Sequence, residues 1–318
     1  MARYILKRVA YSFLTLLLLV SFTFFLMRLM PGDPFVGQKA IPESVHQALR
    51  EKYDLDKPMA VQYLKYITNV FRGDLGESLY YKGRPVTGII AQTFPISADL
   101  GVRSLLVAVV VGLLFGILAA VKRGKLTDTL VMLISVIGVS VPAFIVGGLL
   151  NYFIGYKFSA LMKEWFHLSY NIIPVAGWKN ESYRILPVIA LCLGSLAQIA
   201  RMMRANMIDV LNSDYIKTAK AKGLSPSAVI WKHGIRNGIL PVITILGPMA
   251  AALLTGTFVV EQIFSVPGMG KFFVSSVQTL DYTVISGMTM FYGAFLIVLN
   301  LLVDIAYGFI DPRIRLEK

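Results

Sequence analysis

The sequence predicts an all-α integral membrane protein with about six transmembrane helices. Of its 318 residues, 56% are hydrophobic and only 15% are charged, and the mean hydropathy is +0.66. This composition is too apolar for one soluble core of this size. Apolar runs near the ~20 residues that cross a bilayer recur along the chain, at residues 9–30, 100–121, 130–154, 185–203, 241–260 and 285–310.

The first apolar run follows Arg3, Lys7 and Arg8, as the apolar part of a secretory signal peptide would. It is longer than the ~7–15 apolar residues of a signal peptide, and no small-residue cleavage site ends it. We therefore expect residues 1–30 to form a short cytoplasmic N-terminus and an uncleaved transmembrane helix.

Basic residues next to the apolar runs predict the orientation. If the N-terminus is cytoplasmic, the lysines and arginines of the short loops fall on the cytoplasmic side, at residues 122–125, 201–236 and 313–318. Most of the opposing ones lie between residues 31 and 99, and loops beyond ~60 residues cross largely regardless of charge. An even number of spans also makes the C-terminus cytoplasmic. The net charge of +13 then reflects topology and some attraction to membrane lipid, so it requires no nucleic acid.

Two outer segments are expected. Residues 31–98 form an extracytoplasmic segment in which apolar residues recur at helical spacing over 42–53 and 60–71. Short helices there would either cover the first helix or receive a partner. Residues 157–183 form a second outer loop, whose aromatic residues suit the membrane interface.

The basic segment 213–241 is punctuated as helix, glycine turn and helix. Ser213 precedes a helix that should end before Gly223, and Ser225 precedes a second helix that runs towards His233. Tyr215, Ala219 and Gly223 recur at four-residue spacing and share a face. The two small residues on this face would let another protein approach the backbone closely.

This segment resembles the EAA loop of ABC-importer permeases, which docks on a cytoplasmic ATPase. Lys217 and Thr218 stand where that pattern has Glu and the first Ala, and the gap that follows the glycine is longer than in the general pattern. The matching residues are Ala219, Gly223, Leu240 and Pro241. Residues 214–215, 219, 222–223, 233 and 236–237 resemble the oligopeptide, dipeptide and nickel branch, as do the strings at 30–34, 55–58, 73–76, 264–270 and 311–313.

The resemblance implies a type I ABC-importer permease-like fold and a B-type subunit that translocates oligopeptides. Dipeptides and nickel remain alternatives, and the lack of clustered His, Cys or Met near the predicted path favours peptide. The implied partners are a second homologous permease, two cytoplasmic ABC ATPase subunits and an extracytoplasmic peptide-binding protein. The chain would bind no cofactor, and its partner ATPases would use ATP and Mg. Residues 99–318 would form the permease domain, which includes the coupling loop 213–241.

The resemblance assigns contact with the ATPase to a set of residues in this loop. They are Ser213, Asp214, Tyr215, Thr218, Ala219, Lys222, Gly223, Leu224, Ser225, His233 and Arg236.

Enzyme chemistry finds no support in the sequence. No GxxxxGK[ST] phosphate loop is present, so we expect a transport subunit without its own ATPase site. Cys192 lies within an apolar run, and His46, His167 and His233 fall in separate segments without partners at ligand spacing. No metal site is expected.

A translocation path or gate is expected around Glu261, because charge at membrane depth faces a protein interior or water. Pro267, Gly268 and Gly270 should prevent a regular helix after it, and broken backbone there is tolerated against protein or a water-filled cavity. Thr255 and Thr257 either line the path or pack against another helix.

Two further features bear on the class of transporter. Asp304 either pairs with Tyr307 or a basic neighbour, or serves as the ion-coupled group of a gradient-driven transporter. The absence of an internal repeat argues against the inverted-repeat design of many such transporters. Gly112 and Gly116 favour a close helix contact, within this subunit or with a second one.

Overall fold

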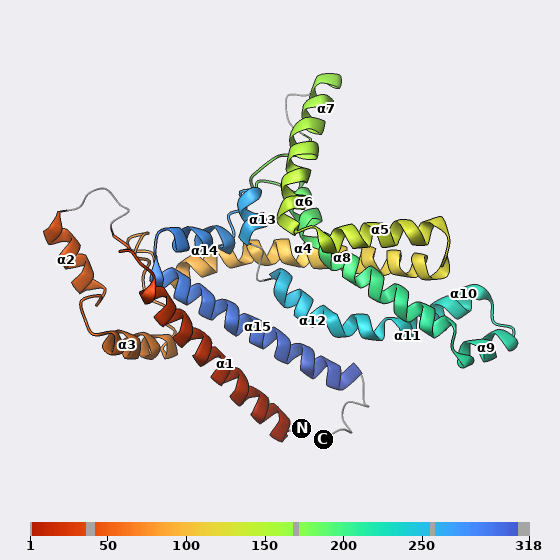
Figure 1. Ribbon diagram of the computed structural model, residues 1–318, viewed down its shortest axis with the longest axis horizontal. Helices are drawn as coiled ribbons and strands as arrows, with labels where there is room; N and C mark the ends of the chain where they lie inside the picture. Colours follow the sequence, from red (N-terminus) through yellow and green to blue (C-terminus); the bar gives the residue numbers. More distant parts are fainter. Residues whose placement is uncertain (1, 36–41, 168–171, 255–257, 311–318) are drawn as a thin grey trace. The chain divides into compact units, whose positions relative to one another are not determined.

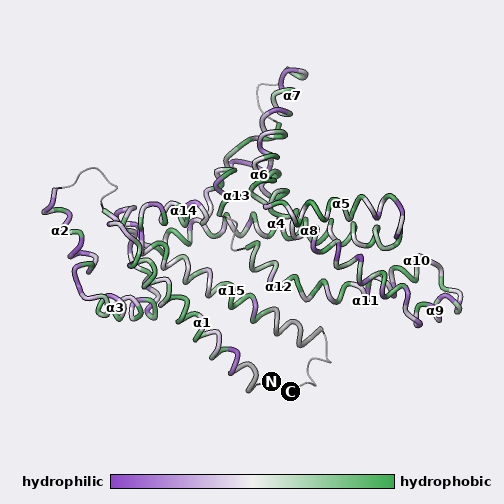
Figure 2. The backbone as a smooth tube through the Cα atoms, in the orientation of Figure 1, coloured by the Kyte–Doolittle hydropathy of each residue, from purple (hydrophilic) through white to green (hydrophobic). Residues whose placement is uncertain are grey.

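The computed structural model describes residues 2–35, 42–167, 172–254 and 258–310 (Figure 1). Apart from one isolated bridge between Glu77 and Pro85, these residues contain no strand, so the predicted all-α class is confirmed. Five described helices are long and apolar enough to cross a membrane, or up to six if the bent pair Pro226–Gly238 and Leu240–Leu254 is one span. Hydrophobic residues run along α4, α5 and α12, whereas α2 and α9 carry many hydrophilic ones (Figure 2).

The chain folds into two compact units that do not follow chain order. The first contains residues 1–96 and 268–298, and the second contains residues 97–267 and 299–318. The predicted permease segment 99–318 therefore contributes to both.

The first unit is built around two long helices. Its elements are α1 (Ala2–Leu29), α2 (Glu43–Lys52), α3 (Met59–Phe71), the first part of α4 (Val86–Val121), α14 (Met269–Gln278) and most of α15 (Tyr282–Ile310). Helices α1 and α15 are in close contact, since a Cβ on Gly293 would lie 2.5 Å from Leu19. The short helices predicted over 42–53 and 60–71 are confirmed as α2 and α3. Between them, hydrogen bonds from Lys57 and Lys65 hold the pKa of Asp54 below its ordinary value.

Asp281 is the polar centre of the first unit. Its carboxylate is fully buried just before α15 and accepts a hydrogen bond from the Ser78 hydroxyl at 2.5 Å. It also accepts from the backbone N–H groups of Leu79 at 3.1 Å, Tyr80 at 3.2 Å and Val284 at 3.2 Å. A carboxylate at this position satisfies a free N–H of the first helical turn and is favoured by the helix dipole. Asp281 thus fixes the turn at residues 78–80 to the start of α15.

The second unit is built around α8. Its elements are the rest of α4, α5 (Leu126–Ser140), α6 (Ala143–Leu150), the π-helical η1 (Asn151–Phe158), α7 (Ser159–Trp165), α8 (Ser182–Leu211), α9 (Asp214–Ala221), α10 (Pro226–Ala228), the π-helical η2 (Val229–Ile235), α11 (Arg236–Gly238), α12 (Leu240–Leu254) and α13 (Phe258–Ile263). Helices α5, α6 and α12 all pack against α8. Glycines allow the closest approaches: a Cβ on Gly112 would lie 2.9 Å from the Leu196 carbonyl oxygen, and one on Gly116 would lie 2.7 Å from that of Ala200. The glycine pair at 112 and 116 therefore serves a contact within this subunit.

An ion pair joins α5 to α8. Asp128 is buried in the first turn of α5, and Arg204 of α8 donates to both its oxygens, at 2.5 Å from Nε and 2.8 Å from Nη2. The backbone N–H of Gly124 donates to the same carboxylate at 3.0 Å. This fork-to-carboxylate geometry gives the strongest kind of side-chain pair and fixes the register of the two helices.

The prediction of one continuous helix over residues 130–154 is wrong. Helix α5 ends at Ser140 and α6 begins at Ala143, because Pro142 disfavours helical backbone at Val141, whose ψ is 123°. The predicted outer loop over 157–183 is wrong in its first part, where the chain stays helical to Trp165. Residues 159–165 lack Gly and Pro and include good helix formers such as Ala160 and Leu161, which explains the extension.

Two other predicted boundaries shift. Helix α4 begins at Val86, within the segment expected to be outside the membrane, and passes through Pro95. Gly270 was expected to help break the backbone, but it lies buried inside α14. Pro267 and the extended Gly268 precede this helix, and Gly270 is buried in its first turn.

We predict that Asp281→Ala lowers the stability of the detergent-solubilised protein. Hydrogen bonds to charged groups contribute about 1.5–3 kcal/mol each, so the loss of several should cost at least about 3 kcal/mol. Thermal unfolding followed by circular dichroism measures the effect. Exposed Asp56 provides the control, and equal melting temperatures for Asp281→Ala and Asp56→Ala would contradict the central role of Asp281.

We also predict a favourable coupling between Asp128 and Arg204. A double-mutant cycle of Asp128→Ala and Arg204→Ala should give an interaction of about 1–3 kcal/mol, since the two side chains share a partly buried network. The exposed pair of Asp214 and Lys217, 2.8 Å apart, is the matched control and should give below about 1 kcal/mol. Similar values for the two cycles would show that burial adds nothing to the pair.

Candidate functional site

The helix, glycine turn and helix predicted in segment 213–241 are confirmed. Helix α9 begins at Asp214, and Gly223, with φ +79°, ends the turn that follows it. Ser225 accepts a hydrogen bond from the Ala228 N–H at 3.3 Å, with Pro226 at the first helical position. Ser213 occupies the N-cap position, but its hydroxyl donates to the Val210 carbonyl at 2.6 Å and does not cap α9.

The exposed face of α9 differs from the predicted one. Ala219 is only 8% exposed, because it lies one helical turn from the buried Ile216 and both residues face the interior of the second unit. Tyr215 is 46% exposed, and a Cβ on the exposed Gly223 would meet no atom within 4 Å. The surface around the turn is therefore formed by Tyr215, Thr218, Lys222, Gly223 and Ser225.

The other residues assigned to coupling are placed around this surface. Asp214 and Arg236 are exposed, while Ser213, Leu224 and His233 are half-buried. Sequence reasoning missed Trp231, whose side chain is 66% exposed on η2. A tryptophan in a basic segment between apolar runs was the available signal, because an exposed aromatic residue outside a membrane suits a protein interface.

Met207 of α8 contacts η2 and α11, the part of the coupling loop that follows α10. It is fully buried, and a Cβ on Gly234 would lie 3.1 Å from its Cε, while one on Gly238 would lie 3.2 Å from its Cγ. The two glycines let η2 and α11 pack directly on this side chain. The coupling loop and α8 are thus closely packed together.

The predicted gate residues are only partly described. Thr255 and Thr257 lie outside the described residues. The Glu261 side chain is fully buried in α13, so it does not line a hollow in this structure. Its backbone carbonyl accepts from the Val266 N–H at 2.8 Å, which closes the turn after α13. Pro267 is exposed and Gly268 is buried, and the chain break lies where the sequence predicted it, between α13 and α14.

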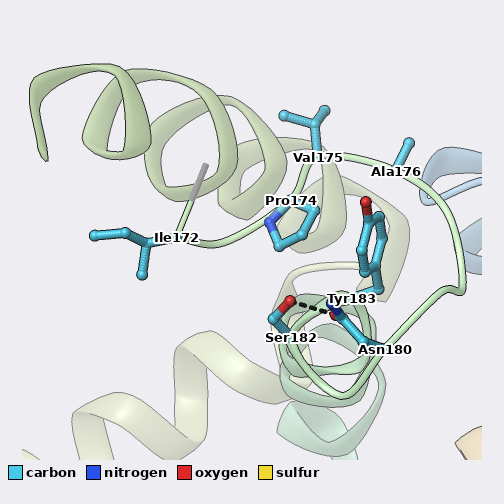
Figure 3. A pocket seen from close by; sticks show the side chains of 7 residues that line it. All are labelled: Ile172, Pro174, Val175, Ala176, Asn180, Ser182 and Tyr183. Atoms are coloured by element: carbon cyan, nitrogen blue, oxygen red, sulfur yellow. Dashed lines mark hydrogen bonds between the residues drawn. The ribbon is translucent and has the colours of Figure 1, made fainter. Parts of the chain in front are cut away.

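Hollows open on the second unit among the residues that the structure describes. One of about 740 Å³ lies beside the loop before α8 and is lined by Ile172, Pro174, Val175, Ala176, Asn180, Ser182 and Tyr183 (Figure 3). One of about 560 Å³ lies at the break between α5 and α6, and one of about 310 Å³ lies against α12. Ser195 and Gln198 of α8 line both of the last two, and Arg201 lines the larger of these.

Charged residues near the hollow of Figure 3 are paired with one another. Arg103 donates to Asp99 at 2.8 Å and to Glu181 at 2.7 Å. Arg184 pairs with Glu181 and lies 3.2 Å from Asp99. These four residues thus neutralise one another at this end of α8.

Metal-binding chemistry has no cluster to support it in the described part of the chain, which contains no group of three or more His, Cys, Asp or Glu residues that could hold an ion. Cys192 is buried within α8. The sites that the geometry offers are therefore a docking surface on the coupling loop and the hollows along α8.

Comparison with known proteins identifies the family. Residues 112–316 match the model of the binding-protein-dependent transport system inner membrane component, and residues 1–101 match that of its N-terminal region. The dipeptide transport system permease protein DppB of Bacillus subtilis is 41% identical over 318 residues, 100% of this chain and 99% of its own length. The oligopeptide transport system permease protein OppB of Haemophilus influenzae is 40% identical over 317 residues, 99% of this chain and all of its own length.

A solved structure shares the fold. The crystal structure of an amino acid ABC transporter with histidines matches 69% of this chain and 92% of its own, with a TM-score of 0.51 at 16% identity. This likeness concerns the fold alone. The two family models together cover most of the sequence, and the relatives match it over its full length. The chain therefore belongs to the binding-protein-dependent transport system inner membrane components, and it is a multi-pass protein of the bacterial cytoplasmic membrane.

Proposed function

We propose that this chain is the transmembrane permease subunit of an ATP-driven importer of oligopeptides. The observation that carries the proposal is the exposed turn between α9 and α10, where Gly223 leaves the backbone open to a partner. The names of the full-length relatives support peptides as the substrate class. Dipeptides are a second candidate, since relatives named for each class are almost equally similar.

In the proposed mechanism, energy enters through the coupling loop. Two ABC ATPase subunits hydrolyse ATP with Mg, and their closure pushes on α9 and α10. Because Met207 packs against Gly234 and Gly238, the force passes from the loop to α8. The transmembrane helices then tilt, and the substrate cavity that they enclose with the second permease opens alternately to the cytoplasmic and to the outer side. This chain contributes no ATPase site of its own.

The partners follow from the same proposal. A second, homologous permease completes the membrane pore, and an extracytoplasmic binding protein delivers the peptide. The distribution of basic residues supports a cytoplasmic location for both termini and for the coupling loop. Residues 42–71, which form α2 and α3, then lie on the outer side.

The first test blocks the docking turn. We expect Gly223→Trp to abolish ATP-driven peptide uptake in proteoliposomes and to lower recovery of the ATPases with the permease by about tenfold, a loss of about 1.4 kcal/mol of binding. Gly124→Trp is the matched control, because Gly124 also has a positive φ, +75°, and no atom within 4 Å of an added Cβ. The strain of a bulky residue is then the same in both variants. Normal uptake by Gly223→Trp would remove this turn from the interface, and uptake without any ATPase would favour a gradient-driven transporter.

The second test concerns the exposed tryptophan of η2. Central aromatic residues of interfaces contribute about 2 kcal/mol or more to binding, so Trp231→Ala should weaken ATPase association by about 30-fold. The melting temperature should stay close to that of the wild type, because the side chain is 66% exposed. Trp165→Ala, which removes a side chain that is 68% exposed on α7, should leave association unchanged. Equal association for the two variants would place Trp231 outside the interface.

A further inference from the structure

Helix α8 carries a polar stripe formed by Ser195, Gln198 and Arg201. The three-residue spacing places these side chains on one face of the helix. Gln198 and Arg201 are exposed and Ser195 is half-buried, whereas the neighbouring Ala197 and Ile199 are fully buried. The stripe therefore faces away from the packed side of α8.

The polar groups of this stripe have no use in the fold itself. Across the described residues, neither Gln198 nor Arg201 has a hydrogen-bond or ion-pair partner, whereas Arg204, one turn along the same helix, is held by Asp128. Arg201 lies within Ser182–Leu211, a helix apolar enough to cross a membrane, towards the end that the basic residues place on the cytoplasmic side. Ionisable residues in such helices face a protein interior or a water-filled space and often mark the routes of substrates.

The stripe opens on the place where another helix is broken. Gly138, Val141, Pro142, Gln198 and Arg201 all line the hollow of about 560 Å³. Because Pro142 has no N–H, the Gly138 carbonyl lacks the donor that a continuous helix would supply four residues later. Broken backbone at membrane depth is tolerated only against protein or a water-filled cavity.

The backbone of α8 comes close to this break. A Cβ on Gly194, the residue before the stripe, would lie only 3.5 Å from the Gly138 carbonyl oxygen. The hollow is thus lined by residues of the broken helix and of the polar stripe together. The second hollow, of about 310 Å³, continues from Ser195 and Gln198 towards α12. The polar stripe is shared by both spaces, as expected of the wall of a path.

We propose that the Ser195–Gln198–Arg201 stripe is a substrate-contact site, at which Arg201 binds a carboxylate of the peptide and Gln198 binds its backbone amides. This inference rests on the proposed function. The planar guanidinium fork fits a carboxylate in a bidentate manner, and an uncharged amide side chain can donate to and accept from a peptide group. A free peptide offers both kinds of partner whatever its sequence.

The test compares peptides that differ in their carboxylates. Proteoliposomes that contain the permease, its homologous partner, the ATPases and the binding protein receive tri-alanine, tri-alanine amide or Ala-Glu-Ala amide. We expect wild-type protein to prefer tri-alanine over its amide by about tenfold or more in kcat/KM, as one charge-assisted contact would give. Uptake of Ala-Glu-Ala amide at the level of tri-alanine would support the proposal, because it would show that Arg201 binds a side-chain carboxylate as well as the C-terminal one.

Variants at Arg201 then assign the preference. Arg201→Gln should reduce the ratio of free to amidated peptide to about one, and Arg201→Lys should give an intermediate ratio, because lysine keeps the charge without the fork. Arg123→Gln removes an exposed cation from the loop before α5 and should keep the wild-type ratio. A different result would overturn the inference. If Arg201 only fixes the orientation of the protein in the membrane, Arg201→Gln would lower the uptake of tri-alanine and of tri-alanine amide equally, and Arg201→Lys would restore the uptake of both peptides.

A labelling experiment adds a readout that does not depend on turnover. The single native cysteine, Cys192, is buried, so Gln198→Cys introduces the accessible thiol. Tri-alanine should protect this thiol from a methanethiosulfonate reagent more strongly than tri-alanine amide does. Equal labelling with and without peptide would overturn the site, even if uptake is normal. Wild-type complex that hydrolyses ATP but takes up no peptide would instead overturn the proposed function, and the inference with it.

Discussion

Close packing of glycine against the backbone of α8 is the constraint on which the second unit depends. Lipid tails are as apolar as the helices, so helix association in a membrane relies on contact and not on the removal of apolar surface from water. Gly112 and Gly116 bring α4 against α8. Gly138 does the same for α5, since a Cβ added to it would lie 3.1 Å from the Leu193 carbonyl oxygen. Larger residues at these positions would push the helices apart. The position of α8 therefore sets the positions of its neighbours.

This packing gives one helix two tasks. At its end, Met207 receives Gly234 and Gly238 of the coupling loop, and about two to three turns earlier the helix carries the polar stripe at Ser195, Gln198 and Arg201. The pair of Asp128 and Arg204 lies between these regions and attaches α5. In the proposed mechanism, a displacement of the coupling loop would move α8 and α5 together. The hollow at the end of α5 would then change shape as a direct result of the displacement of the coupling loop.

Local rules accounted for much of the fold, because the features they describe depend on neighbouring residues alone. The apolar runs located the long helices, and Ser225, Pro226 and Gly223 located the helix, turn and helix of the coupling loop. The break at Pro142 was missed because hydropathy averages over a window and does not register one absent N–H. Ala219 was misplaced for another reason. Its burial depends on packing between segments far apart in the chain, which periodicity does not describe.

The candidate site shows the same limit most clearly in two arginines of α8. Arg201 and Arg204 are one turn apart, and by sequence alone both count equally as basic residues at a helix end. The fold separates them, because the start of α5 brings Asp128 to Arg204, while the break at the other end of α5 leaves space beside Arg201. A paired arginine contributes to structure, whereas an unpaired one beside a polar hollow remains available for a ligand. The difference in role thus arises from where α5 begins and ends.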